Sequence, residues 1–237
     1  MSTQVREKQP LWRQLFTSQI GKKLLTGLTG LGLTLFVIVH MAGNLSYFAG
    51  NEAYNAYAHK LLSLGPLLYI AELGLLAFFV FHIVLGVNIY LGKRKAREQG
   101  YKRYKTAGGQ SKQSLSSRSM IVTGVILGVF LVLHLVSFKF GAYYEAAESI
   151  DGKPVRDLAR LLNEKFQSPL YAFGYSGVMV LLALHLRHGI WSAFQSLGAT
   201  NPRLTPLIYT LGALVGLLIA VGFFILPLWI FFTGGNA

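Results

Sequence analysis

The chain has 237 residues, of which 53% are hydrophobic and only 13% are charged. A soluble domain carries about 25% charged residues, so this chain lacks the charge to cover an ordinary water-exposed surface, and it is too apolar to be disordered. Its 22 Lys and Arg residues against 9 acids give a net charge of +13. Few charges of mostly one sign are typical of a membrane protein with basic loops, and they argue against a nucleic-acid-binding domain.

Five apolar stretches are each long enough to cross about 30 Å of hydrocarbon as a helix, which takes about 20 residues. The first is too long for the apolar region of a signal peptide, so we expect it to stay in the chain. The last contains Pro227, where we expect a kink. The sequence predicts an all-α bundle of five transmembrane helices in one domain, 1–237, with spans at 24–48, 66–92, 119–141, 169–197 and 206–232.

The connections between the spans differ in charge. Of the 22 basic residues, 15 lie in the N-terminal segment and in the loops after the second and fourth spans, together with only two acids. By the positive-inside rule, the N-terminus is expected in the cytoplasm and the C-terminus outside. On the outer side, residues 51–63 and 154–166 are amphipathic at helical spacing, and we expect them to lie on the membrane surface as helices.

The chain has no cysteine, which excludes disulfides, thiolate-bound iron–sulfur clusters, zinc ribbons and covalently attached haem. Any metal must therefore be held by histidine or carboxylate. Six histidines are present, and five of them lie inside predicted spans. Polar side chains at that depth are expensive, and they usually face a site.

The depths of these histidines predict two pairs at two heights. At 1.5 Å per residue, His82 lies about 15 Å from the cytoplasmic end of its span, and His185 lies at nearly the same depth in the fourth span. His188 faces the same way one turn on, and spacing alone does not choose between the two. His40 and His134 match each other near the outer ends of the first and third spans. The two heights should differ by about 10–15 Å.

Paired histidines on facing helices can supply both axial ligands of a porphyrin iron, for which neutral imidazole is a good ligand. A flat macrocycle also needs room beside the backbone. Gly86 follows His82 by four residues, Gly189 follows His185 by four, and Gly43 follows the histidine of the first span by three. Two stacked bis-histidine haems would form a transmembrane path for electrons.

Two other interpretations remain open from the residues alone. Glycines in spans often do no more than pack helices, as we expect the pairs at 124–128 and 212–216 to do. A histidine-based metal or proton transporter would want carboxylates among the histidines, and only Glu72 is clearly within the membrane.

Several local sequences resemble the di-haem cytochrome b anchor subunit of succinate dehydrogenases and fumarate reductases, in its five-helix, single-subunit form. The similarity runs through nearly the whole chain, and its most specific piece is LHLRHGIWSAFQSLG at 184–198. The other pieces are VHMAGNL at 39–45, the stretch from AHKLLSLG to GVNIY over 58–90, SRSMIVTG at 117–124 and LHLVSFKFG at 133–141.

The resemblance implies a ligand set of two haems b. One haem would be held by His82 and His185 near the cytoplasmic side, and the other by His40 and His134 near the outside. In the fourth span the family ligand precedes a glycine by four, which selects His185 over His188. The resemblance makes Arg187 and His188 candidates for contacts with the haem propionates. Ordinary anchoring at the membrane interface is the alternative.

The resemblance also implies partners and a place. Electrons would pass between membrane quinone and an iron–sulfur subunit on the cytoplasmic side, while succinate or fumarate reacts on a separate flavoprotein. The membrane would be the cytoplasmic membrane of a prokaryote. The basic loop 93–118 is placed to meet the iron–sulfur subunit, or else it only sets topology and meets anionic lipid. A di-haem cytochrome b of a hydrogenase or formate dehydrogenase is the nearest alternative.

The quinone, expected to be menaquinone, is placed near the outer haem. Glu72 lies about six residues into the second span, where a carboxylate could exchange a proton with quinol. We expect Glu72 to line this site with Asn44 and Tyr47, although Glu72 could instead bond a neighbouring helix. Some members carry a proton-relay glutamate two residues before the ligand of the fourth span, but this chain has Ala183 there.

Overall fold

The computed structural model describes residues 10–96, 115–147, 149–150, 152, 154–199 and 201–235. These residues form helices and contain no β-strand, only an isolated bridge between Glu145 and Arg156. The predicted all-α class is therefore confirmed. In chain order the helices are α1 (Leu11–Thr17), α2 (Gln19–Leu45), the 3₁₀ turn η1 (Ser46–Ala49), α3 (Asn51–Leu62), α4 (Pro66–Lys95), α5 (Leu115–His134), the π-helical turn η2 (Leu135–Lys139), α6 (Leu158–Phe166), α7 (Pro169–Ser196) and α8 (Leu204–Thr233).

Five helices are long and apolar enough to cross a membrane: α2 with η1, α4, α5 with η2, α7 and α8. They coincide with the five predicted spans. The first begins at Gln19, five residues earlier than expected, because Ser18 caps it by accepting a hydrogen bond from the backbone N–H of Gly21 at 3.0 Å. Proline stands in the first turn of α4 and of α7, where its missing N–H costs nothing. Pro227 lies inside α8, which continues past it to Thr233.

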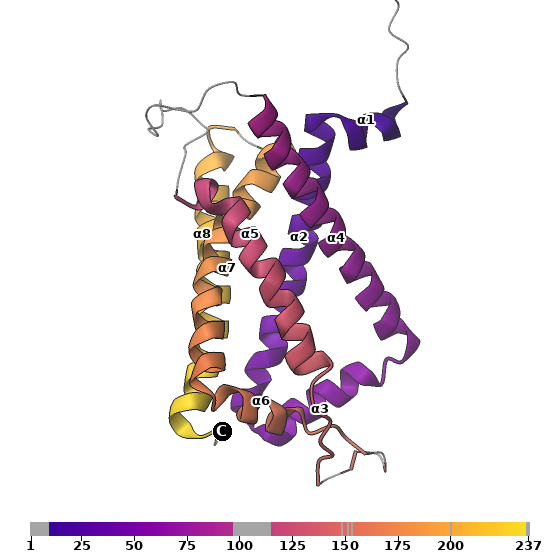
Figure 1. Cartoon of the computed structure of the whole chain (residues 1–237), viewed down its shortest axis with the longest axis vertical. Coiled ribbons are helices and arrows are strands. Elements are labelled where there is room, and N and C mark those ends of the chain that lie inside the picture. The colour runs from indigo at the N-terminus through magenta and orange to yellow at the C-terminus, as the bar shows by residue number, and fades with distance from the viewer. Residues whose placement is uncertain are drawn as a thin grey trace, which may run out of the picture.

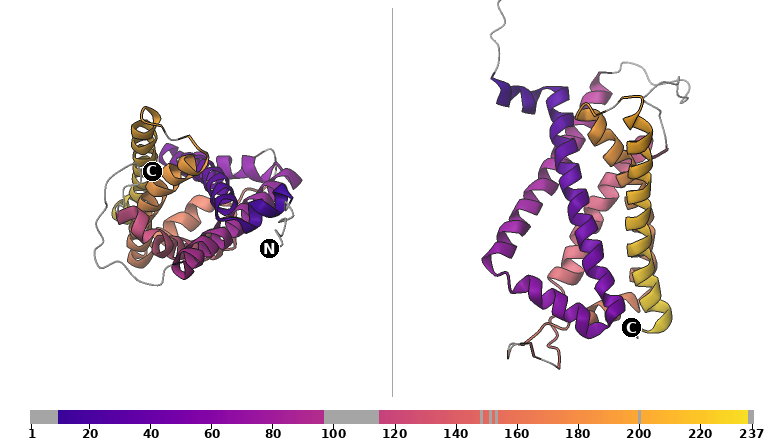
Figure 2. Two further views of the ribbon diagram at one scale, coloured as in Figure 1. Left: turned by 90° about the horizontal axis from the view of Figure 1, so that it is seen from above. Right: turned by 180° about the vertical axis from the view of Figure 1, so that it is seen from behind.

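The spans pack unevenly (Figure 1). The helices α7 and α8 approach closely at Gly212 and Gly216, where a side chain would press on the backbone carbonyls of Arg187 and Ala183. These two glycines therefore pack helices, as expected. By contrast, α4 lies against α2 at one end and diverges from it towards the end that carries α3 (Figures 1 and 2). Of the residues of α4, only Leu85 is buried.

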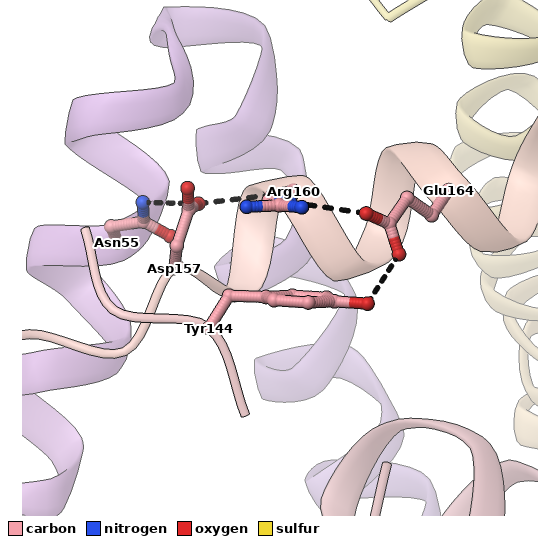
Figure 3. Close-up of polar contacts among 5 residues, drawn as sticks. All are labelled: Asn55, Tyr144, Asp157, Arg160 and Glu164. Atoms are coloured by element: carbon pink, nitrogen blue, oxygen red, sulfur yellow. Dashed lines mark hydrogen bonds and ion pairs between the residues drawn. The ribbon is translucent and has the colours of Figure 1, made fainter. Parts of the chain in front are cut away.

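A polar cap joins α3, α6 and the segment that precedes α6 (Figure 3). Asn55 on α3 donates a hydrogen bond to the carboxylate of Asp157 at 2.9 Å and accepts one from the backbone N–H of Ala159 at 2.9 Å. Asp157 also caps α6 by accepting from the N–H of Arg160 at 3.0 Å. On the exposed side, Glu164 accepts hydrogen bonds from Arg160 at 3.0 Å and from Tyr144 at 2.7 Å. Tyr144 and Asp157, in the segment that precedes α6, are thus bonded to α6 and α3.

The two amphipathic segments are helical, with one correction. Residues 154–157 are not part of a helix, because they are extended: the N–H of Asp157 bonds the carbonyl of Tyr144 at 2.8 Å. The helix starts only at Leu158. Its apolar side chains Leu161, Leu162 and Phe166 join one buried cluster with residues of η1, α3, η2 and α8, so the bundle rather than lipid covers this face of α6.

Charge is segregated between the two ends of the bundle. One end carries α1, the end of α4, the start of α5 and the α7–α8 connection (Figure 1). The described cations of this end are Arg13, Lys22, Lys23, Lys93, Arg94, Lys95, Arg118 and Arg203, and no described acid accompanies them. The described acids Glu52, Glu72, Glu145, Asp157 and Glu164 lie towards the other end. Arg6, Lys8 and most of the basic loop, 97–114, lie outside the described residues.

Candidate functional site

An open cavity of about 2580 Å³ lies among α2, α4, α5 and α7. Ligand cavities for one small molecule usually measure about 300–1,000 Å³, so this one has room for more than one. Its lining includes all the histidines of the spans, namely His40, His82, His134, His185 and His188. The residues that the sequence singled out therefore converge on one space.

The inner pair faces across this cavity. The ring centres of His82 on α4 and His185 on α7 lie 6.4 Å apart. Two imidazoles that share one metal have ring centres about 6 Å apart, since each metal–nitrogen bond measures about 2 Å. The structure thus brings together the two side chains that equal depth had paired.

Threonines fix the ring of each inner histidine. Nδ1 of His82 lies 3.2 Å from the backbone carbonyl of Thr26, which can only accept, so Nδ1 is the donor. Nδ1 of His185 lies 3.0 Å from the hydroxyl of Thr123, which in turn donates to the carbonyls of Ser119 and Met120. Because the hydroxyl proton is used there, His185 donates to its oxygen. In both rings the lone pair is left on Nε2, the state in which histidine binds a metal.

The outer pair has a different environment. The ring centres of His40 on α2 and His134 on α5 lie 5.8 Å apart. Each ring stacks on an aromatic ring one turn earlier in its helix, His40 on Phe36 at 5.4 Å and His134 on Phe130 at 5.8 Å. Nδ1 of His134 is buried and has no hydrogen-bond partner among the described residues. An aromatic shell, rather than threonines, positions this pair.

The two pairs stand at two heights. Thr29, whose hydroxyl lies 3.4 Å from Nδ1 of His82, precedes His40 by 11 residues on α2. Thr123, the partner of His185, likewise precedes His134 by 11 residues on α5. At 1.5 Å per residue, both helices give a vertical separation of about 16 Å. This value lies just above the separation of about 10–15 Å expected from the sequence.

Glycines line the cavity beside the inner pair. A side chain at Gly86 or Gly189 would meet no atom of the described residues within 4 Å, and both residues line the cavity. A Cβ at Gly124 would lie 3.4 Å from the ring of His185, and Gly128 is open to the cavity. The pair at 124–128 therefore makes room for the site, and the expectation that it packs helices is wrong.

Gly43 serves a different purpose from the one its spacing suggested. A side chain there would overlap the ring of Tyr57 on α3. Because Gly43 has no side chain, α3 can fold against the end of α2. Gly43 does not line the cavity.

The donor set restricts what the pairs could hold. Within the described ranges, no three His, Cys, Asp or Glu side chains gather around one point. Structural metal sites built from protein alone take four ligands, whereas a haem iron needs only axial ones because the porphyrin supplies the rest. Two imidazoles, one on each side of a roomy apolar cavity beside glycines, fit a bis-histidine haem and do not fit a protein-only metal site.

The two residues expected near the propionates lie in different places. His188 lines the cavity beside His185. Arg187 does not, because its guanidinium donates a hydrogen bond to the hydroxyl of Tyr209 on α8 at 2.9 Å and lies 5.2 Å from the centre of that ring. Nothing in this geometry supports a propionate contact by Arg187.

Of the three expected quinone residues, two line the cavity. Asn44 donates to the carbonyl of His40 at 2.8 Å and accepts from the hydroxyl of Tyr54 at 3.2 Å. Glu72 also lines the cavity and forms an ion pair with Lys139 of η2. The bond to a neighbouring helix, which the sequence left open, is therefore present.

The expectation that Tyr47 lines the quinone site is wrong. Its side chain is fully buried in the apolar cluster that contains Leu161 and Phe166 of α6. There its hydroxyl donates to Asn163 at 2.5 Å and lies 2.9 Å from the carbonyl of Gly235. The 3₁₀ turn η1 turns it towards α6 and away from the cavity. Tyr47 is a structural residue of the cap.

Sequence reasoning missed the partners of the predicted residues. Thr26, Thr29 and Thr123 contact the inner histidines, and Lys139 pairs with Glu72. Comparing the depths of polar residues in different spans would have indicated Thr123, which lies near the level of His185. Lys139 carried a weaker signal, as a cation at the outer end of an apolar span.

No protein-family model, no curated protein and no solved structure matches this chain.

Proposed function

We propose that this chain is a membrane-embedded di-haem cytochrome b that carries electrons between quinone and an iron–sulfur subunit, as the anchor of a succinate:quinone oxidoreductase. The observation that carries the haem proposal is the inner pair: two rings 6.4 Å apart across a cavity, each with Nδ1 already engaged. The resemblance of the sequence supplies the choice of succinate or fumarate.

The chain's own residues would hold the two groups. His82 and His185 would ligate one iron through Nε2, while Thr26 and Thr123 orient the rings. His40 and His134 would ligate the other iron within an aromatic shell that limits access of water. Each haem supplies a one-electron redox centre when bound.

Charge supports an orientation for this path. The basic end of the bundle belongs in the cytoplasm by the positive-inside rule, so the N-terminus lies inside and the C-terminus outside. That orientation puts the inner pair nearest to an iron–sulfur subunit, with a flavoprotein beyond it, in the cytoplasmic membrane of a prokaryote. The outer pair then lies about 16 Å further across the membrane.

The quinone, proposed as menaquinone, would react at the outer level of the cavity. Glu72 and Asn44 line it there, and Glu72 is the group able to exchange a proton with quinol. Its ion pair with Lys139 holds the carboxylate at the side of the cavity where α4 diverges from its neighbours.

Purification of the full chain from its own membranes tests the proposal. We expect a reduced-minus-oxidised spectrum of haem b, two haems per chain, and co-purification of a flavoprotein with succinate–quinone activity. Co-purification of a nickel or molybdenum subunit would assign the chain to a hydrogenase or formate dehydrogenase instead. A folded chain without haem would overturn the electron path and favour a transporter.

A further inference from the structure

A second, smaller cavity lies at the basic end of the bundle, between the start of α2 and the end of α4. It measures about 380 Å³ and shares only Arg94 with the lining of the histidine cavity. Its described lining holds cations, amides and two apolar residues from both helices and no acid: Gln19, Lys22, Asn88, Leu91, Gly92, Arg94 and Lys95. Nothing in the proposed electron path uses this cavity.

The three cations of this cavity have no partner of opposite charge among the described residues. In the part of the chain that the structure describes, Lys22, Arg94 and Lys95 form no ion pair, and the described ion pairs, Lys139–Glu72 and Arg160–Glu164, lie at the other end. Like charges gathered around one space repel each other, and an anion between them relieves that repulsion. The cavity therefore favours an anionic ligand.

An amide marks how deep the ligand reaches. Asn88 is exposed on α4 among the exposed apolar side chains Val84, Val87 and Leu91. Its Nδ2 donates to the carbonyl of Val84 at 2.8 Å. An exposed amide on an otherwise apolar, lipid-facing surface is costly unless a polar group meets it. Asn88 lines the same cavity as the cations and thus offers a polar group between them and the apolar face of α4, where the ester region below a lipid phosphate would lie.

The helix α1 places the membrane–water interface at this height. It leaves the bundle at a steep angle to α2 (Figure 1), and Trp12 and Phe16 on it are 66% and 49% exposed. Ile20, in the first turn of α2, is 80% exposed. Exposed aromatic and aliphatic side chains next to cations are typical of a segment lying in the headgroup region. Gln19 and Lys22 of the cavity follow α1 directly in the chain.

We propose that this cavity binds the headgroup phosphate of an anionic phospholipid from the same leaflet. Lys22, Arg94 and Lys95 neutralise the phosphate, and Gln19 lies against α4 at Gly92, where a side chain would collide with its amide. Asn88 meets the polar region beneath the phosphate, and the acyl chains run along the exposed apolar face of α4. Basic pockets between transmembrane helices bind such headgroups through this chemistry. The site does not depend on the haem proposal.

Lipid titration of the purified full chain in a neutral detergent tests the site. Short-chain phosphatidylglycerol should raise the melting temperature in a saturable way, whereas phosphatidylcholine with the same chains should not. Replacing Lys22, Arg94 and Lys95 together by Gln should weaken binding roughly 100-fold, at about fivefold for each cation. Native mass spectrometry should show one tightly held anionic lipid on the wild type and none on this variant.

A charge-matched control separates the cavity from general attraction. Replacing Arg13, Arg118 and Arg203 by Gln removes the same charge from the same end of the bundle, at cations that do not line this cavity, and should leave lipid binding intact. Equal losses in the two variants would mean diffuse attraction and would overturn the site. If inorganic phosphate reproduces the melting shift, the ligand of the cavity is a free anion. If the triple variant loses the partner subunits but still binds lipid, its three cations form a protein-docking surface instead. Should the triple variant not fold, Asn88→Leu keeps all charge and should still weaken binding.

Discussion

Thr123 on α5 accepts a hydrogen bond from Nδ1 of His185 on α7, with 3.0 Å between the two atoms. This contact joins two spans at the level of the inner pair and fixes which nitrogen of His185 carries the lone pair. It also distinguishes the two levels of the cavity, because Nδ1 of His134 has no such partner among the described residues.

Removing this hydroxyl should loosen the inner haem. Thr123→Val keeps the shape of the side chain but leaves the imidazole free to turn. Since partners of this kind are worth about 10–100-fold in metal affinity, we expect haem loss of that order from one of two sites. Haem content after extended dialysis measures it. Thr123→Ser keeps the acceptor and should retain haem; loss in both variants would point to packing instead.

The structure favours His185 over its neighbour as the ligand. His185→Leu should leave one haem per chain, because the ring that faces His82 at 6.4 Å is gone. His188→Leu should retain two, since this residue only lines the cavity wall. Pyridine haemochrome assays of both variants decide the matter, and the reverse result would show that the two roles are exchanged.

Gly86 offers a test of whether a macrocycle occupies the inner level. In the protein alone a side chain there meets no described atom within 4 Å, and replacing glycine inside a helix usually stabilises it by up to about 1 kcal/mol. Gly86→Leu should nevertheless cost one haem, because the side chain enters the cavity. Gly74→Leu is the matched control on the same helix, equally open but outside the cavity lining. Full haem content in both variants would contradict the proposed placement.

Variants of the ion pair between Glu72 and Lys139 distinguish a chemical role of Glu72 from a structural one. If Glu72 exchanges the proton of quinol, Glu72→Gln should slow quinol oxidation about 10²-fold or more and leave both haems in place. The double variant Glu72→Lys, Lys139→Glu restores an ion pair with the charges exchanged. We expect it to remain slow; recovery of the rate would show that bridging α4 to η2 is all that Glu72 does.

The polar cap should matter for stability rather than for redox chemistry. Asn55→Ala leaves the buried N–H of Ala159 without its acceptor and should lower the free energy of unfolding by about 1–3 kcal/mol. Asn51→Ala, at an exposed position on the same helix, should change it by no more than about 0.5 kcal/mol. Thermal unfolding in detergent compares the two. An equal effect would mean that α3 contributes through helix propensity alone.

Residues that act through their depth in a span were predictable from the sequence. Hydropathy marked the spans, and counting residues along them paired His82 with His185 and His40 with His134, because a straight helix converts position into height. The resemblance made Arg187 a candidate, which the same regularity would have excluded: two residues from His185, it lies on the opposite face of α7, and the structure finds it bonded to α8.

Residues that act through distant contacts were not predictable. Tyr47 neighbours Asn44 in sequence, but the turn η1 directs it to Asn163, 116 residues away. Glu72 meets Lys139 across 67 residues, and Gly43 accommodates a ring that belongs to α3. No periodicity in one chain encodes such pairings, since they depend on how the ends of the helices turn and close.

The sparse burial of α4 has a consequence for assembly. Leu85 is the only buried side chain of this helix, which packs mainly against α2 at one end, so the diverging half of α4 gains little of its stability from protein contacts. A helix in this position depends on whatever fills the cavity beside it, and occupancy shifts the folding equilibrium by mass action. The prosthetic groups would then serve as the missing hydrophobic core of α4, and their supply would limit how much of the chain matures in the membrane.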